Sequence, residues 1–263
     1  MIDLHTHLLP GIDDGPATME GSVELALALS ESRVRGVAAT PHCRADHPKV
    51  VPGELSARCA QLSAELAARG IDLGVVHAGE VDLAWALEAS DEDLRAVSFR
   101  GLGQDLLVET PYGPLTSTFE TLLFRIALRG YRLLLAHPER NPTFQEDPER
   151  IEALVARGTL VQITSSSLLR SPRSSRSAKL AHRLLEDGQV HVIASDSHGP
   201  AAPGRASLAE GTLAAAEIVG RPQAWWLVER VPQAIILGKP LPPAPAPAMP
   251  RRRGGVLGRL RAR

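Results

Sequence analysis

Short apolar runs alternate with longer segments of helical period along most of the chain, and this alternation limits the fold more than any other feature. The apolar runs have four to seven residues, the length of a buried strand, and the segments between them repeat their apolar positions as amphipathic helices do. The expected strands lie near residues 2–7, 37–42, 73–80, 105–110, 132–137, 160–164 and 190–196. The expected helices lie near residues 20–34, 54–69, 82–96, 116–129, 148–157, 175–187 and 205–218. This pattern predicts a parallel sheet with crossover helices, as an open doubly wound sheet or a barrel.

The first expected strand carries two histidines, His5 and His7. Residues two apart in a strand point to the same face, so the two imidazoles leave the strand side by side. Imidazoles at this spacing can hold one metal ion, although a core strand with two hydrogen-bonded histidines has the same pattern.

Later strands end in the same kind of residue, and this recurrence favours the barrel. The His, Asp and Glu residues at or just after their ends are His42, Glu80, Glu109, His137, Asp196 and His198. The strand near 160–164 offers no strong ligand. Side chains at these ends converge only if the strands close into a ring, where active sites lie at that face. The sequence therefore predicts a polynuclear metal site. The remaining histidines are interpreted as structural or surface residues: His47, His77, His182 and His191.

Length and composition agree with one large α/β domain. The chain has 263 residues, of which 44% are hydrophobic, enough for a sizeable core. It has no run of 18 or more apolar residues and no basic region followed by an apolar stretch at its start, so neither a transmembrane helix nor a signal peptide is expected. Two cysteines, Cys43 and Cys59, do not make a disulfide framework, and a reducing cytoplasm is the simplest setting.

The charge is divided between an acidic body and a basic end. Residues 251–263 contain six Arg and no acidic residue, which leaves 23 basic and 30 acidic side chains, or a net charge of −7, in the rest of the chain. An acidic body argues against nucleic acid as a partner. Residues 240–250 alternate Pro with Ala, as extended linkers do. We therefore expect a barrel domain over 1–239 and a disordered linker and Arg-rich tail over 240–263, a tail suited to weak contact with an anionic membrane surface.

Together the polar motifs resemble those of the polymerase-and-histidinol-phosphatase (PHP) superfamily. The motifs that carry the resemblance are His5-Thr6-His7, Asp13-Asp14-Gly15-Pro16, Thr40-Pro41-His42, Gly79-Glu80, the strand ending at Glu109, His137-Pro138-Glu139-Arg140 and Ala194-Ser195-Asp196-Ser197-His198. The segment Leu9–Pro16 and the His-Pro-Glu-Arg form are similar to the bacterial manganese-dependent tyrosine-protein phosphatases of the CpsB, CapC and YwqE type, which are encoded with capsule and exopolysaccharide genes. The resemblance covers about residues 1–240.

The resemblance implies a distorted (β/α)7 barrel that binds two or three divalent ions, expected to be Mn²⁺, with Fe or Zn²⁺ compatible with the same ligand types. The first ion would lie between His5, His7, Glu80 and Asp196. Glu80 would bridge to a second ion that is completed by Glu109 and His137. A third ion would be held by Asp14, His42 and His198, where the choice of Asp14 over Asp13 follows the family register alone.

The resemblance also implies hydrolysis of phosphotyrosine in a protein, with a membrane-bound tyrosine autokinase as the expected substrate. Arg140 and Arg205 are the expected phosphate ligands, through bidentate guanidinium contacts. A cysteine phosphatase is not supported, because neither Cys43 nor Cys59 is followed by Arg six positions later. Two alternatives stay open: a small-molecule phosphatase such as a histidinol-phosphate phosphatase, and a non-catalytic metal-bound scaffold for polysaccharide assembly.

Overall fold

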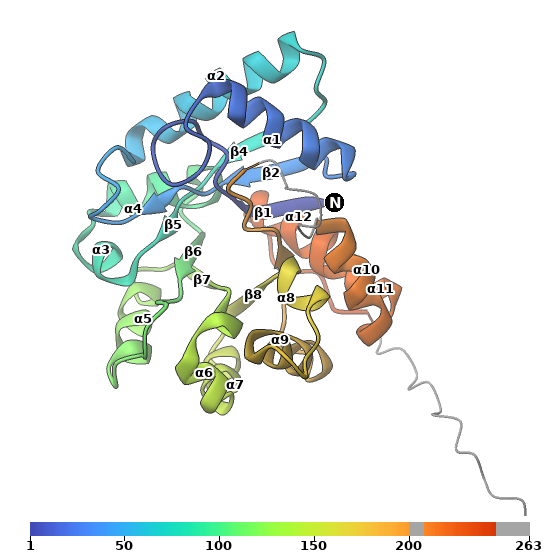
Figure 1. The fold of residues 1–263 in the computed structure, drawn as a ribbon. Coiled ribbons are helices and arrows are strands. Elements are labelled where there is room, and N and C mark those ends of the chain that lie inside the picture. Colours follow the sequence, from blue (N-terminus) through green and yellow to red (C-terminus); the bar gives the residue numbers. More distant parts are fainter. Residues whose placement is uncertain (200–207, 246–263) are drawn as a thin grey trace, which may run out of the picture.

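The structure, a computed structural model, describes residues 1–199 and 208–245. Figure 1 shows the strands at the centre of the molecule and the helices around them. The strands of the described residues are β1 (Ile2–Thr6), β2 (Gly36–Ala39), β3 (His42–Cys43), β4 (Gly74–His77), β5 (Glu80–Val81), β6 (Asp105–Glu109), β7 (Arg132–Ala136), β8 (Leu160–Thr164) and β9 (Val192–Ala194). Arg205 and the tail from residue 246 onward lie outside the described residues.

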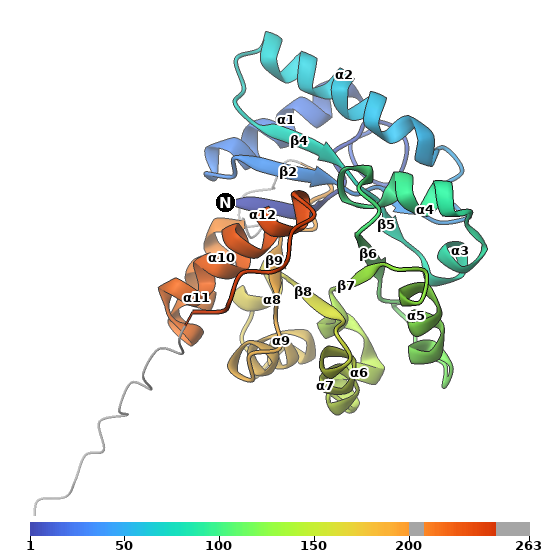
Figure 2. The ribbon, with the colours of Figure 1, turned by 180° about the vertical axis from the view of Figure 1, so that it is seen from behind.

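Helices follow most of the strands and cover their outer side. They are α1 (Met19–Glu31), α2 (Leu55–Ala68), α3 (Leu83–Glu88), α4 (Asp91–Val97), α5 (Phe119–Ala127), α6 (Pro142–Glu146), α7 (Glu149–Ala156), α8 (Ser165–Leu169), α9 (Arg176–Glu186), α10 (Leu208–Val219), α11 (Arg221–Trp225) and α12 (Val231–Ile236). Short 3-10 helices occur as η1 (Pro52–Glu54), η2 (Phe99–Gly101) and η3 (Pro138–Arg140), and η4 (Trp226–Arg230) is a π-helix. Figure 2 shows from behind that α12 lies beside the N-terminal strand and that α10 and α11 continue the same helical layer outward.

All strand pairs are parallel, and they form two sheets. One sheet has the order β1-β2-β4, and the other has the order β3-β5-β6-β7-β8-β9. Every residue of β6 and β8 is buried, as expected when both faces of a parallel sheet are covered, whereas β4 at the edge of its sheet has no buried residue. No helix among residues 1–199 and 208–245 is long and apolar enough to cross a membrane.

Two of the expected strands are each divided into two, and the divisions separate the sheets. The expected strand at 37–42 becomes β2 and β3, interrupted at Thr40 and Pro41, and the expected strand at 73–80 becomes β4 and β5, interrupted at Ala78 and Gly79. Pro41 has no N–H for the ladder. A side chain at Gly79 would place its Cβ only 2.5 Å from the Cys43 Sγ, so the close approach requires glycine.

Hydrogen bonds continue across both interruptions and bring the two sheets together. The Thr40 N–H donates to the Thr6 carbonyl at 2.8 Å, and the Glu80 N–H donates to the Pro41 carbonyl at 3.0 Å. The register is the same on both sides of the interruptions: Ala39 lies opposite His77, and His42 lies opposite Glu80. The unchanged register therefore aligns two of the expected ligands on neighbouring strands.

The first strand also meets the segment that follows the last one. The Asp196 N–H donates to the His5 carbonyl at 2.9 Å, and the His7 N–H donates to the Ser197 carbonyl at 2.8 Å. Thr6 and Ser197 form an isolated parallel bridge. The carboxyl ends of β1 and β9 thus lie side by side, so that residues 190 positions apart in the sequence share one site.

Candidate metal centre

The side chains expected as ligands lie together at the carboxyl ends of the strands. They come from β1 and the loop after it (His5, His7, Asp14), from β3, β5 and β6 (His42, Glu80, Glu109), and from the turns after β7 and β9 (His137, Asp196, His198). Most of them are buried, and Asp14 and His198 lie nearer to solvent. The described residues contain four overlapping groups of His, Asp and Glu whose ligand atoms lie within 4.8 Å of one another in each group.

The two histidines of the first strand are at the centre of one group. The His5 Nε2 and His7 Nε2 atoms are 3.3 Å apart. The Glu80 Oε2 atom lies 3.2 Å from His5 Nε2 and 3.6 Å from His7 Nε2, and the Asp196 Oδ1 atom lies 3.3 Å and 3.4 Å from the same two nitrogens. His5, His7 and Glu80 therefore form one close group, and Asp196 lies beside both histidines, as expected of the residues around a first ion.

Glu80 connects this group to the next. Its Oε1 atom is 2.9 Å from His137 Nε2, and its Oε2 atom is 3.0 Å from His42 Nδ1. The Glu109 Oε2 atom lies 3.8 Å from the same His42 nitrogen. A carboxylate placed between two groups has the geometry of a bridging ligand. His42 Nδ1 also takes part here, whereas the sequence places this residue only with Asp14 and His198.

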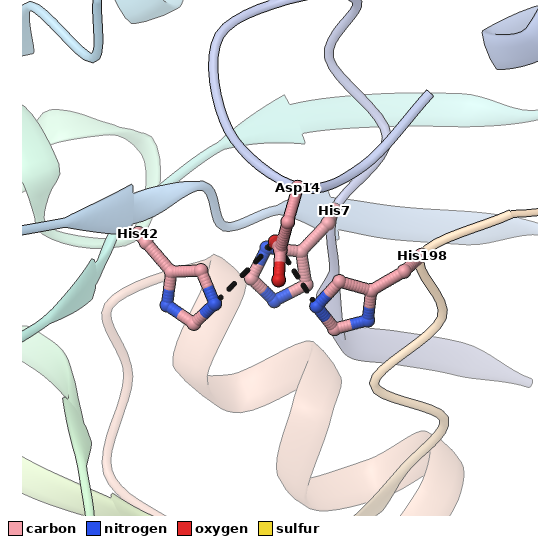
Figure 3. A group of neighbouring side chains, drawn as sticks. All are labelled: His7, Asp14, His42 and His198. Atoms are coloured by element: carbon pink, nitrogen blue, oxygen red, sulfur yellow. Dashed lines mark ion pairs between the residues drawn. The ribbon is translucent and has the colours of Figure 1, made fainter. Parts of the chain in front are cut away.

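A third group lies at the rim and is drawn in Figure 3. The Asp14 Oδ1 atom is 3.5 Å from His42 Nε2, 3.3 Å from His198 Nε2 and 3.8 Å from His7 Nδ1. The preceding residue points elsewhere: Asp13 Oδ2 lies 2.8 Å from His7 Nδ1 and accepts the His42 N–H at 3.3 Å. The two neighbouring acidic residues thus have different surroundings. Asp14 lies between His42 and His198 of the rim group, and Asp13 contacts His7 and the backbone of His42.

The donor set fits divalent cations. Glu80 Oε2 and His42 Nδ1 are buried 3.0 Å apart, and neither makes a hydrogen bond among the described residues. Buried polar atoms are otherwise almost always hydrogen-bonded, so this close pair inside the cluster indicates a shared ligand such as a cation. Mixed carboxylate and imidazole donors suit first-row transition ions.

Without ions, protons balance the buried carboxylates. Burial opposes the charged form of His5, but the Glu80 and Asp196 carboxylates overcome this and raise the pKa of His5 to about 9. Burial likewise opposes the charged form of His7, but hydrogen bonds with Asp13 and Asp196 raise its pKa to about 10. Burial favours neutral Glu80, yet His5 and His137 hold the pKa of this carboxyl well below its usual range. Because a metal ligand must be deprotonated, ion binding would release these protons.

Three further polar residues support the centre, and two of them, Gln162 and Arg44, are not singled out by the sequence. The Gln162 Oε1 atom lies 3.0 Å from His5 Nδ1, and Gln162 is fully buried in β8. The Asp13 Oδ2 atom likewise lies 2.8 Å from His7 Nδ1, so His5 in β1 and His7 just after it each have an oxygen beside Nδ1, the nitrogen that does not contact Glu80. Arg44 Nη1 donates to Glu109 Oε1 at 3.0 Å. Arg44 follows His42 by two residues, which is the only signal in the sequence for it.

Arg140 faces the centre from the turn after β7. His137 adopts a left-handed backbone conformation, with φ of 37°, which turns the chain into η3. Arg140 Nη1 then donates to Asp196 Oδ2 at 2.7 Å. Of the histidines interpreted as structural or surface residues, His47 lies nearer than expected, because its ring stacks on His42 at 5.3 Å between centroids.

Comparison with known proteins assigns the family. Residues 1–228 match the model of the family described as capsular polysaccharide synthesis, CpsB/CapC. The chain therefore belongs to the CpsB/CapC family. Tyrosine-protein phosphatase YwqE of Bacillus subtilis is 33% identical over 200 residues, which cover 75% of this chain and 77% of that protein. Tyrosine-protein phosphatase CpsB of Streptococcus agalactiae is 27% identical over 206 residues, which cover 75% and 83%.

A solved structure agrees with these relatives. It comes from crystal structures of YwqE from Bacillus subtilis and CpsB from Streptococcus pneumoniae, described as unique metal-dependent tyrosine phosphatases. It superimposes with a TM-score of 0.82 at 28% sequence identity and covers 95% of this chain and 100% of that chain. A mixed α/β single-domain fold with parallel sheets is thereby shared.

Proposed function

We propose that this protein is a metal-dependent protein-tyrosine phosphatase. The observation that carries the proposal is the convergence of imidazole and carboxylate groups around Glu80, with the Arg140 guanidinium at its edge. Phosphate monoester hydrolysis needs an activated water, charge compensation at the phosphoryl oxygens and a leaving group that departs easily. Family membership and the two named phosphatase relatives support the same reaction class.

We assign the ions to Mn²⁺ and divide the ligands as the family resemblance implies, although in the structure His137 groups with His5 and Asp196, and Glu109 groups with His42 and Glu80. His5, His7, Glu80 and Asp196 would hold one ion, Glu80, Glu109 and His137 a second, and Asp14, His42 and His198 a third. When bound, such ions lower the pKa of water and compensate charge on a phosphoryl group. His42 reaches towards two of these groups through its two ring nitrogens, so its placement affects both.

The chain's own residues would then orient the reaction. Asp13 and Gln162 fix the ring planes of His7 and His5 through their outward nitrogens. Arg140, held by Asp196, is placed to take two phosphoryl oxygens with its planar guanidinium. Arg205 is retained as a second phosphate ligand in this proposal, although it lies outside the described residues. Phenolate is a weaker base than an alkoxide, so phosphotyrosine needs less protonation of its leaving oxygen.

We further propose that the two sheets close as a distorted (β/α)7 barrel over residues 1–239. The hydrogen bonds from β1 to the segment after β9, and those across the interruptions at Pro41 and Gly79, support closure. Convergence of ligands from both sheets supports it as well.

The proposed substrate is the phosphotyrosine segment of a membrane-bound tyrosine autokinase that controls capsule or exopolysaccharide synthesis, not a nucleic acid. The proposed location is the cytoplasm, where the unpaired thiols of Cys43 and Cys59 would stay reduced. The six Arg of residues 251–263 would add weak contact with anionic lipid. Co-sedimentation with anionic and neutral vesicles, for the full chain and a chain ending at Leu241, tests this contact. Equal behaviour of the two chains would remove it.

A phosphatase assay with metal analysis tests the function. The protein is treated with chelator, reloaded with Mn²⁺, Fe²⁺, Zn²⁺ or Mg²⁺, and assayed on phosphotyrosine peptide, phosphoserine peptide and histidinol phosphate. We expect chelated protein to be inactive and Mn²⁺ to restore hydrolysis of phosphotyrosine best. Preference for histidinol phosphate would indicate a small-molecule phosphatase. Bound metal without hydrolysis of any of the three would indicate a scaffold.

A further inference from the structure

An exposed aromatic residue borders the metal centre. Tyr112 lies in the loop between β6 and α5, three residues after Glu109. Its ring stacks on His137 with 6.2 Å between ring centroids and 20° between ring planes, and 61% of the residue is exposed. One side of the ring therefore faces a residue of the centre while much of the remaining surface stays open to solvent.

The loop that carries this ring is held from both sides. The Asn141 side-chain amide donates to the carbonyls of Pro111 at 2.6 Å and Gly113 at 2.9 Å, the two neighbours of Tyr112. Asn141 is 1% exposed, and its side-chain oxygen accepts the Thr143 N–H at 2.9 Å at the start of α6. The Asn141 side chain, which holds the loop, is therefore itself fixed by the first turn of α6. Asn141 directly follows Arg140. The loop that carries the Tyr112 ring is therefore hydrogen-bonded to the residue next to Arg140.

Other exposed aromatic residues of the described chain lie elsewhere. Phe124 is 55% exposed on α5, and Trp225 is 49% exposed on α11. Only Tyr112 among these three has a ring contact with a histidine of the centre in the described residues. Burial, followed by the charge of Asp196, raises the pKa of the Tyr112 phenol, and the ring therefore stays neutral at neutral pH.

We propose that Tyr112 is a specificity-determining residue that packs against the aromatic ring of the substrate. The inference rests on the proposed phosphatase function. A phosphoryl group bound between Arg140 and the ligand cluster would direct its ester group towards solvent, and Tyr112 is an exposed aromatic residue that borders this cluster through His137. Offset or edge-to-face contact between two rings requires centroids about 4.5–7 Å apart, and an alkyl ester cannot form it. Tyr112 thus favours aryl phosphates over alkyl phosphates.

Binding of two non-hydrolysable phosphonates tests this inference apart from catalysis. Calorimetry on the Mn²⁺-loaded protein gives the affinities for phenylphosphonate and methylphosphonate. We expect Tyr112→Ala to weaken phenylphosphonate binding about 3- to 10-fold, the range of an aromatic pair, while methylphosphonate binding changes by less than about 2-fold. Tyr112→Phe should retain the wild-type ratio, because the ring and not the hydroxyl makes the contact. Metal content should be the same in all variants.

Phe124→Ala is the matched control, since it removes an equally exposed ring from the same half of the chain. It should leave both affinities unchanged. Equal weakening of both phosphonates by Tyr112→Ala, or no weakening of either, would overturn the inference. If the wild-type protein binds phenylphosphonate selectively through Tyr112 but hydrolyses no phosphotyrosine, the proposed function fails and the specificity site stands.

Discussion

Strand β6 has a buried carboxylate at each end, and the two carboxylates have different charged neighbours. Asp105 begins the strand and is 2% exposed, and Glu109 ends it and is 4% exposed. At the first, Arg132 donates from Nε to Oδ1 at 2.5 Å and from Nη2 to Oδ2 at 3.0 Å. At the second, Glu109 faces the Glu80 carboxylate, and burial followed by that charge raises its pKa.

The difference separates a structural charge from a functional one. At the amino end the chain supplies a bidentate counterion, so the carboxylate is satisfied within the protein. At the carboxyl end carboxylates crowd together, Arg44 compensates only part of Glu109, and Glu80 contacts imidazoles. Charge there is completed by protons or by ions from solution. Substitutions at the two ends should therefore affect different measurements.

The largest effect is expected at Glu80. Glu80→Ala removes the carboxylate shared by two ligand groups, so bound metal per chain should fall. Phosphatase activity should drop by more than about 100-fold, because loss of a residue that only supports a metal ligand already costs up to about 100-fold. Metal analysis and kcat/KM on an aryl phosphate measure this. His77→Ala, three residues earlier, should change neither. Wild-type metal content in Glu80→Ala would disprove the bridging assignment.

At the amino end the effect should be on stability alone. Arg132→Met leaves Asp105 buried without its counterion and should lower the free energy of unfolding by about 2–4 kcal/mol at pH 7, somewhat less than for a fully buried pair because Arg132 is 28% exposed. Burial already raises the pKa of Asp105 in spite of Arg132. Losing Arg132 raises it further, and an acid with a raised folded pKa loses stability as pH rises above its unfolded value.

Urea unfolding at pH 4.5 and pH 7 measures this loss, which should be smaller at the lower pH. Arg129→Met is the control, because its partner Asp91 is 89% exposed and such pairs contribute at most about 1 kcal/mol. Metal content and kcat/KM of Arg132→Met should equal those of the wild-type protein. Reduced metal binding would show that the two ends of β6 are coupled.

A smaller effect is expected behind the metal ligands. Asp13→Asn replaces the charged partner of His7 by a neutral one, so metal affinity should fall by about 10-fold while saturating Mn²⁺ restores the full stoichiometry. Asp14→Asn alters a member of the rim group and should lower the stoichiometry by one ion. Titration calorimetry on the two variants distinguishes them. An exchange of these outcomes would reverse the roles assigned to the two neighbouring acids.

The convergence of the expected ligand residues was predictable because most of them end or follow an apolar strand run. Glu109 and His137 show this directly, since each ends or follows a buried strand whose register fixes its end of the sheet. The division of the third expected strand at Gly79 was not predictable, because it depends on how closely Gly79 approaches Cys43 in space. The contact of Gln162 with His5 joins residues 157 positions apart, and no local pattern indicates it.

The smallest effect is expected at Cys43, which tests whether the reactive group at the carboxyl end is the charged cluster or a thiol. Cys43 is 2% exposed beside His42, and burial, followed by the Glu80 carboxylate, raises the pKa of its thiol. A buried neutral thiol is a poor nucleophile, and its S–H contacts the Pro41 carbonyl at 3.6 Å.

Cys43→Ser keeps a small side chain with a donor for the same carbonyl, so kcat/KM should stay within about 2-fold of wild type, with unchanged metal content, and the cost in unfolding free energy should be about 1 kcal/mol. Steady-state kinetics, metal analysis and urea unfolding on one preparation measure all three. Cys59→Ser, at the other buried cysteine, controls for general loss of packing. Inactive Cys43→Ser protein with normal metal content and stability would assign the nucleophile to the thiol. Activity near wild type would instead support a water molecule, activated in the Glu80 cluster, as the nucleophile.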